Sequence, residues 1–503
     1  MASALTGLFG FIVILLTITI TLIQALLELS YSYIERRLTI TPRCVRLFRL
    51  VLGAVVAFEL ADKYPTLQSL YSDDGALPRS SALPIDGSPQ TSLVWAVCLH
   101  AWHGSLLWAK FLCAVQLAAA AALASSYHPI TSSLICWWLH CSWCLRNASL
   151  VYILDRYLHL LLLYSAFLPK STEPAWHFSK PSTASCVLAI QLLIIYFDAG
   201  YAKYSDPARA WSVFAPVAAL DTYLRHTTIA RYIRSLLGPF GLRLSGSAAV
   251  GIEMLAAPCS LLAPTQRLRS LFLLAVFSLH LGIALTMRNT QLLSAAAITA
   301  WLPFIDMAPP VYPHYQIRQP PPSRVRQVLL LGFAALVVHY NLIEGGDGVG
   351  CGGRASPDSV RRLLLHNRWN VFASAESYVV WEIAPARLSD GSIVDLWRDD
   401  PSDGGGSGES VIAWEVPTGP EPKVHRGRWR AFPYTAERDE EGEAAFWGAL
   451  CDEWERSDTV EGRRVERFAF YLMQADTLDG EEDGGYGQVR KRLIKRFDCR
   501  LRK

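Results

Sequence analysis

The residues best suited to chemistry lie in one apolar stretch, Tyr196-Phe-Asp-Ala-Gly-Tyr-Ala-Lys203, which is followed by Trp211. An apolar helix over this stretch places Asp198 and Lys203 at a membrane boundary, where a charged group is costly and is by default a functional candidate. Beside a dry pocket the ammonium form of a lysine is disfavoured, so the amine becomes available as a base. The alternative is a lysine at a helix end whose ammonium reaches back to water.

Two further polar residues lie inside apolar runs. His280 lies within Phe272–Met287, where a neutral imidazole can bond a facing helix or handle protons, or is simply a satisfied core histidine. Glu253 lies in Gly251-Ile-Glu-Met-Leu-Ala-Ala-Pro258, and a carboxylate in such surroundings must be paired or protonated. We therefore take Lys203 and His280 as candidate catalytic residues, and Asp198, Trp211 and Glu253 as candidate substrate-binding residues.

A metal site is the weaker interpretation of His140, Cys141 and Cys144, which fall within one apolar run. A structural zinc site needs four ligands, and no second ligand pair is apparent in the sequence. We predict no metal site. No glycine-rich phosphate-binding loop occurs between a predicted strand and a predicted helix, and the net charge of +3 is too small to indicate nucleic-acid binding.

The elements that position these residues are predicted from an uneven distribution of charge. Residues 1–350 contain 24 Lys+Arg and 16 Asp+Glu, whereas residues 351–503 contain 23 and 28. Gly7 to Leu27 is uncharged and long enough to span a bilayer, although a signal peptide is the alternative. Nine more apolar runs follow: Cys44–Ala61, Ser105–Ser125, Ile130–Leu145, Leu150–Leu168, Ala184–Ala202, Ala248–Leu262, Leu271–Met287, Leu292–Phe304 and Val328–Leu342.

These runs predict a multi-pass α-helical membrane protein with about 8–10 transmembrane helices and a small soluble α+β C-terminal domain. The expected parts are an N-terminal transmembrane segment at 1–30, a helical membrane domain at 44–343, a glycine-rich linker at 344–360, the soluble domain at 361–482 and a charged tail at 483–503. The lipid bilayer is the expected partner.

The arginines at positions 36, 37, 43, 46 and 49 place the loop between the first two runs in the cytoplasm. With ten spans, the C-terminal domain is then extracytoplasmic, in an endomembrane or the plasma membrane. The loop at 203–245 also falls outside, although its six basic residues count against that side.

The polar part has the pattern of a small mixed domain. Val379–Ile383 and Ile393–Trp397 are predicted strands joined through a turn at Ser389–Ser392. Glu440 to Arg456 is a predicted helix, and Val465–Leu472 is a predicted strand. Cys351, Cys451 and Cys499 could form one disulfide in an oxidising compartment, but the sequence does not pair them.

Several short motifs occur in the order found in the HTTM (horizontally transferred transmembrane) domain, and over about 400 residues the chain resembles that family. The motifs are Arg49–Gly53, Asp62 and Tyr71–Arg79; Arg146-Asn147, Asp155-Arg156 and Phe167–Pro169; Ala199–Lys203 with Trp211; Glu253–Pro258 and His280–Met287; and Arg368–Ala373, Leu388–Gly391 with Asp395, and Arg428–Arg430.

The HTTM family is related to vitamin K-dependent gamma-glutamyl carboxylase, which is similar in having a Gly-x-x-Lys step at this place. The resemblance implies that Lys203 is the base that deprotonates reduced vitamin K or another quinol, with His280 in the corresponding later helix. Ala148 stands where the carboxylase has a histidine that supports its lysine. Two hypotheses therefore stay open: a carboxylase-like or quinol-linked membrane enzyme, or a non-catalytic lipid-binding, transport or scaffold protein whose ligand is a hydrophobic quinone or lipid.

Overall fold

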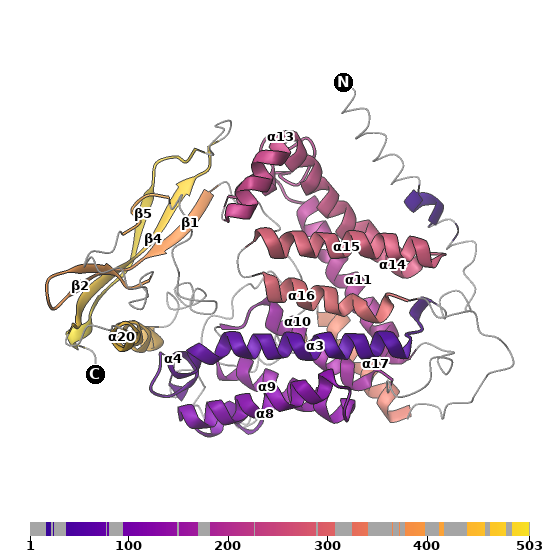
Figure 1. The fold of residues 1–503 in the computed structure, drawn as a ribbon, viewed down its shortest axis with the longest axis horizontal. Coiled ribbons are helices and arrows are strands. Elements are labelled where there is room, and N and C mark those ends of the chain that lie inside the picture. Colours follow the sequence, from indigo (N-terminus) through magenta and orange to yellow (C-terminus); the bar gives the residue numbers. More distant parts are fainter. Residues whose placement is uncertain are drawn as a thin grey trace.

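A computed structural model describes the helices and the sheet of this chain (Figure 1). The described residues are 17–21, 24, 37–76, 78–79, 94–147, 150–169, 182–225, 227–287, 290–306, 324–340, 365, 372, 378–397, 412–416, 440–457, 463–478 and 485–501. Most of the predicted N-terminal span at 7–27, the glycine-rich linker at 344–360, and most of the motifs at 368–373 and 428–430 lie outside them.

The first helices form one packed group. They are α3 (Pro42–Lys63), the short α4 (Leu67–Tyr71) and α7 (Leu99–Trp102), α8 (Leu106–Ala124), α9 (Pro129–Arg146) and α10 (Ile153–Phe167). Two of these helices begin with a side-chain cap: the Thr41 and Ser105 side chains accept hydrogen bonds from backbone N–H groups of the first turn of α3 and of α8. Glycine at position 53 lets α3 approach α8 closely, because an added Cβ would lie 2.5 Å from the Ala120 carbonyl oxygen.

A second group holds the candidate residues. It contains α11 (Thr183–Tyr204), α12 (Ala219–Tyr223), α13 (Thr228–Gly251), the π-helical turn η4 (Ile252–Ala256), α14 (Ala257–Leu262) and α15 (Gln266–Thr286). The expectation of a loop at 203–245 is therefore wrong from Thr228 onward. Gly238, with φ 61°, and Pro239 break α13, which hid its helical pattern in the sequence.

The remaining helices are α16 (Gln291–Trp301), which continues into the 3₁₀ turn η5 (Leu302–Phe304), and α17 (Arg324–His339). Figure 1 shows α15, α16, α3 and α8 side by side in that order, and successive members of this row are in contact. All nine apolar runs from Cys44 onward correspond to helices, within a few residues at most ends.

Four helical segments among the described residues are long and apolar enough to cross a membrane: Leu106–Ala124, Thr183–Tyr204, Thr228–Leu262 and Gln266–Thr286. The outward face of α15 is apolar, which suits contact with lipid. Leu271, Leu274, Leu281 and Leu285 recur at helical spacing along α15, and all four side chains are exposed. An exposed apolar stripe of this length is unfavourable in water and favourable against acyl chains.

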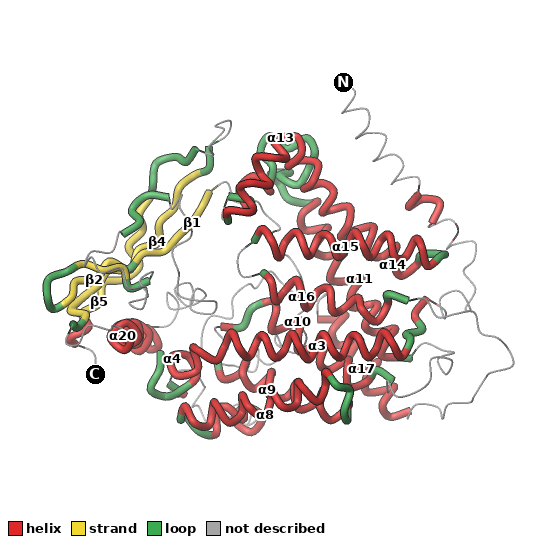
Figure 2. The backbone as a smooth tube through the Cα atoms, viewed as in Figure 1, coloured by secondary structure: helices red, strands yellow, loops and turns green. Residues whose placement is uncertain are grey.

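The polar part contains a five-stranded antiparallel sheet (Figure 2). Its strands are β1 (Tyr378–Ile383), β2 (Pro385–Leu388), β3 (Ile393–Asp395), β4 (Val465–Asp476) and β5 (Arg490–Asp498). The long β4 is central: β1 and β2 pair in succession along one of its edges, and β5 pairs along the other. The predicted turn closes β2 onto β3, with Gly391 at φ 87°.

The predicted helix is α20 (Glu440–Ser457), and the predicted strand at Val465 extends to Asp476. The region 483–503 was predicted to be a charged tail, but Arg490–Asp498 forms edge strand β5. Strand β5 contains five Lys and Arg residues, and this density of charge indicates a tail when the sequence is considered alone. Basic side chains are common on edge strands because they prevent further strands from pairing there.

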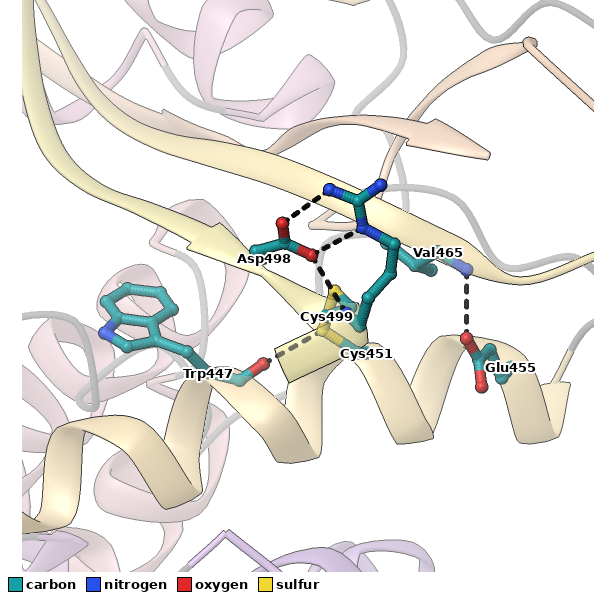
Figure 3. Close-up of a disulfide and its surroundings, with 7 residues drawn as sticks. Trp447, Cys451, Glu455, Val465, Asp498 and Cys499 are labelled. Carbon is teal, nitrogen blue, oxygen red and sulfur yellow. Dashed lines mark hydrogen bonds and ion pairs between the residues drawn. A yellow bond between two sulfur atoms is a disulfide. The ribbon is translucent and has the colours of Figure 1, made fainter. Parts of the chain in front are cut away.

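A disulfide between Cys451 and Cys499 ties α20 to the residues that follow β5 (Figure 3). Next to it, Asp498 accepts two hydrogen bonds from the Arg500 guanidinium, at 2.9 and 2.7 Å. These bonds lower the pKa of the exposed Asp498 carboxyl to about 2. The Glu455 carboxylate accepts from the Val465 backbone N–H at 2.9 Å, so α20 is attached to the start of β4 as well.

Candidate functional site

Lys203 and Glu253 form the central contact of the candidate site. Lys203 lies in the last turn of α11, and its Nζ donates to both carboxylate oxygens of Glu253, at 3.0 and 2.9 Å. A third, longer hydrogen bond of 3.3 Å runs from Nζ to the Ala199 carbonyl oxygen. The Lys203 and Glu253 side chains are only 5% and 10% exposed. An ion pair this buried loses much hydration, so its hydrogen bonds must compensate.

The local sequence explains why Glu253 faces α11. Pro258 cannot donate a backbone hydrogen bond, and its ring would clash with the Met254 carbonyl in a regular α-helix. The chain widens instead into the π-helical turn η4, where the Ala257 N–H bonds the Ile252 carbonyl. Single π-turns of this kind occur frequently at functional sites.

A glycine on α11 lets this widened turn approach. A Cβ added at Gly200 would lie 2.4 Å from Met254 Cγ and 3.1 Å from Glu253 Cβ. The Gly-x-x-Lys spacing therefore has a physical basis here: Gly200 brings the two backbones together, and Lys203 then reaches the carboxylate one turn further along α11.

Trp211 covers the lysine. Lys203 Nζ lies 5.6 Å from the Trp211 ring centroid, which is within cation–π range. The Trp211 ring stacks on Tyr223 with centroids 6.0 Å apart, and Phe372 meets Tyr223 edge to face at 5.0 Å. The buried Trp211 Nε1 has no hydrogen-bond partner among the described residues. This orphaned donor is able to bind an oxygen atom of a ligand.

His280 contributes to a neighbouring contact rather than to the ion pair. Its Nε2 is in a short hydrogen bond with the Tyr196 hydroxyl, and both side chains are buried. The Tyr196 ring also meets Trp301 edge to face, with centroids 5.3 Å apart. Tyr196 precedes Lys203 by seven positions, or about two helical turns, so both side chains lie on one face of α11.

The five candidate residues are therefore not all together. Lys203 contacts both Glu253 and Trp211, and His280 approaches the same helix face through Tyr196. Asp198 is half-buried on α11 and lies roughly 140° around the helix from Lys203. We do not include Asp198 in the site.

Lys63 is a second buried lysine, which we did not identify from the sequence. Lys63 pairs with Glu59 one turn earlier on α3, and both side chains are 1% exposed. Lys63 Nζ lies 5.5 Å from the Trp143 ring centroid. Two oppositely charged residues four positions apart at the end of an apolar run were the available signal. The predicted run ended at Ala61, before the lysine.

Three residues of the motifs at 71–79 and 146–147 also meet. Asp73 binds Arg79 at 2.8 Å, and its carboxylate lies 3.6 Å from the Arg146 guanidinium. Partial burial acts against ionisation of Asp73, but the hydrogen bonds and charge of Arg79 outweigh it and lower the pKa of this carboxyl. Ala148 lies outside the described residues.

The fold and site define a helical protein with four segments of membrane-spanning character, a small antiparallel sheet and a buried lysine–glutamate pair between helices. No family model, no curated protein and no solved structure matches this chain. Chemically, the site can hold one proton between an amine and a carboxylate without a change in net charge. It also offers one indole donor beside an aromatic stack.

Proposed function

We propose that the chain is a multi-pass membrane enzyme of HTTM type that deprotonates a hydrophobic quinol, with Lys203 as the base. The observation that carries the proposal is the buried contact of Lys203 Nζ with Glu253 beside the Trp211 ring. A buried lysine and a buried acid outside any simple packing role are uncommon in lipid-facing helices, and they mark candidate sites of proton transfer.

The residues present fit a quinol in two respects. The Trp211 indole N–H has no acceptor among the described residues and can donate to a quinol oxygen, while the Trp211–Tyr223 stack offers an aromatic surface. When bound, the quinol supplies an acidic hydroxyl and two electrons for reaction with an oxidant such as oxygen. Glu253 takes one proton from Lys203, and the freed Nζ then accepts the hydroxyl proton. Gly200 and the π-turn keep the two helices close enough for this exchange.

The test is turnover of purified protein in lipid nanodiscs with reduced vitamin K and, separately, a short-chain ubiquinol. Quinol oxidation is measured, and carbon dioxide incorporation is measured with a glutamate-containing peptide added as the acceptor. We expect Lys203→Ala to lower turnover by about 10²- to 10⁴-fold, the usual contribution of a general base. Lys63→Ala removes the other buried lysine and is the matched control. Unchanged turnover in folded Lys203→Ala protein would exclude Lys203 from the mechanism.

One observation favours the second candidate function, a non-catalytic lipid-binding, transport or scaffold protein. All three ammonium hydrogens of Lys203 have an acceptor, namely the two Glu253 oxygens and the Ala199 carbonyl. A pair whose hydrogen bonds are all formed can have a purely structural role, which is to join α11 to η4. Native mass spectrometry of the purified protein separates the candidates: a retained lipid without quinol turnover favours binding, whereas a quinone that is chemically converted favours the enzyme.

We also infer that the C-terminal domain faces an oxidising compartment, on the extracytoplasmic side of an endomembrane or the plasma membrane. The support is the Cys451–Cys499 disulfide, since disulfides persist outside the reducing cytosol. Sealed vesicles treated with protease on the cytoplasmic side should keep residues 351–503 intact. Their digestion, together with full maleimide labelling of Cys451 and Cys499 without reductant, would reverse this orientation.

A further inference from the structure

We propose that His140, Cys144 and Asp155 bind one transition-metal ion, with zinc as the expected ion. His140 and Cys144 lie four positions apart on α9, so both side chains project from one face of that helix. Asp155 lies in the first turn of α10, after the connection that returns the chain to α9. The three residues therefore lie where the C-terminal part of α9 packs against the start of α10.

The ligand atoms converge. His140 Nε2 is 3.9 Å from Cys144 Sγ and 4.0 Å from Asp155 Oδ1, and all three atoms lie within 4.8 Å of one another. In a tetrahedral zinc site with bonds of about 2.0–2.3 Å, neighbouring ligand atoms are roughly 3.3–3.7 Å apart. Closing the cluster onto an ion requires movements of about 1 Å or less, within the reach of side-chain rotation.

The Asp155 side chain is already oriented for this role. Its Oδ2 accepts a hydrogen bond of 3.1 Å from the Tyr152 backbone N–H, so Oδ1 is the oxygen directed toward His140. A ligating carboxylate is normally held in this way by a hydrogen bond to its other oxygen. The His140 ring currently bonds the Asp155 carbonyl through Nε2 at 2.9 Å, and its Nδ1 has no partner among the described residues. Metal binding moves the imidazole proton from Nε2 to Nδ1.

Charge also favours a divalent ion. His140 and Asp155 are fully buried and Cys144 is 3% exposed. A carboxylate, a thiolate and a neutral imidazole bring two negative charges, which a divalent cation neutralises, so the buried cluster has no net charge. One sulfur, one nitrogen and one oxygen donor suit zinc better than the hard ions magnesium and calcium, which prefer oxygen alone. A water molecule completes the tetrahedron.

From the sequence we predict no metal here, because Cys141 and Cys144 lack a second ligand pair. The structure changes the candidate set, because Cys141 is not in the cluster and Asp155 supplies the third protein ligand. The Cys141 side chain packs in an apolar cluster that also contains Val94, Cys98 and Cys144. It is therefore a matched control: the same residue type, also buried, three positions away on the same helix.

The experiment measures metals in the full chain, purified with an affinity tag free of histidine. A buried ion exchanges slowly, so it should remain through purification. Inductively coupled plasma mass spectrometry should find about one zinc per chain in the wild type and in Cys141→Ala. Cys144→Ala should fall close to zero while it still elutes as a monodisperse peak. A wild type with only substoichiometric metal, or Cys144→Ala with an unchanged metal content, would overturn the site.

A second measurement needs no variant and so does not depend on Cys144→Ala folding. Zinc-edge X-ray absorption of the wild type should show one sulfur neighbour at about 2.3 Å and nitrogen or oxygen neighbours at about 2.0–2.1 Å. A spectrum without sulfur, or with two or more sulfur ligands, would contradict the assignment and indicate an adventitious ion or a different cluster.

Discussion

Two buried lysine–glutamate pairs, each beside a tryptophan, differ in how their surroundings are completed. Glu59 and Lys63 belong to one helix, and the nearby Trp143 donates its Nε1 hydrogen to Gln116 Oε1 at 2.8 Å. Lys203 and Glu253 come from two helical segments 50 residues apart, and the indole N–H of Trp211 has no partner among the described residues.

The aromatic neighbours show the same contrast. The His100 ring lies against the Trp143 ring at a centroid distance of 3.8 Å, whereas Trp211 stacks on Tyr223 at 6.0 Å. The two pairs therefore differ in their tryptophans: the Trp143 indole has an acceptor, and the Trp211 indole has none among the described residues. Burial of a charged pair alone does not identify a site; the feature that separates these two pairs is the indole donor beside Lys203, which has no acceptor among the described residues.

The largest expected effect comes from breaking the pair between helices. Lys203→Met leaves the Glu253 carboxylate buried without its partner, which costs about 3–5 kcal/mol of stability. The double variant Lys203→Met/Glu253→Gln removes both charges and should recover much of this loss without recovering quinol turnover. Thermal unfolding in nanodiscs and turnover on the same samples check both parts. A double variant with wild-type turnover would make the pair a structural link only.

Neutralising the pair within α3 should have a smaller functional effect. Lys63→Met/Glu59→Gln removes two charges from a core that has no unused indole donor, so we expect quinol turnover to be retained while stability changes. A steady-state assay on folded protein measures this. Loss of turnover at normal stability would mean that the α3 pair also takes part in the reaction, and the distinction between the two regions would fail.

Gly200→Ala tests the close approach that brings Glu253 to Lys203. The new Cβ overlaps Met254 Cγ, so the helices must separate, at a cost of about 1–3 kcal/mol. Gly282→Ala on α15 is the control because nothing lies within 4 Å of its added Cβ, and alanine favours a helix over glycine. Unfolding curves of the two variants should move in opposite directions. Equal shifts would show that the approach at Gly200 is not tight.

Much of the helical architecture could be predicted from the sequence, because a long apolar run forms a helix whichever segments pack against it. The runs around Ala184–Ala202 and Leu271–Met287 match α11 and α15 closely. Strand β5 and the first half of α13 could not be recognised in this way. Basic residues obscured β5, and Gly238-Pro239 interrupted the periodicity of α13.

The site was predictable as a set of residues but not as a set of contacts. A charge in an apolar run must find a partner, which singled out Lys203 and Glu253 separately. Their pairing depends on the π-turn ahead of Pro258 and on the glycine at 200, and both act through three-dimensional packing. The same limit applies to Asp155, which approaches His140 only after the chain has turned back on itself.

The two tryptophans allow a sharper and smaller test. Trp143→Phe leaves the buried Gln116 oxygen without its donor, which should cost about 1–3 kcal/mol. Trp211→Phe removes a donor that has no acceptor in the described part of the chain, so its cost should be smaller, while the KM for the quinol should rise. Denaturation and steady-state kinetics of both variants measure this difference. A larger stability loss at Trp211 would indicate a hidden partner for its Nε1.

The smallest effect is expected at the exposed Asp498–Arg500 pair, which provides a baseline for the buried ones. Because the pKa of Asp498 is lowered to about 2 from 3.8, its stabilising contribution is complete above pH 3.8 and is lost as the pH falls toward 2. Arg500→Ala should therefore differ from the wild type only above this range, and added salt should remove the difference by screening. Melting curves at low and high salt test this. Salt should barely alter the effect of Lys203→Met, because screening does not reach a pair enclosed between helices. Equal salt sensitivity of the two variants would instead show that the Lys203–Glu253 pair is exposed to water.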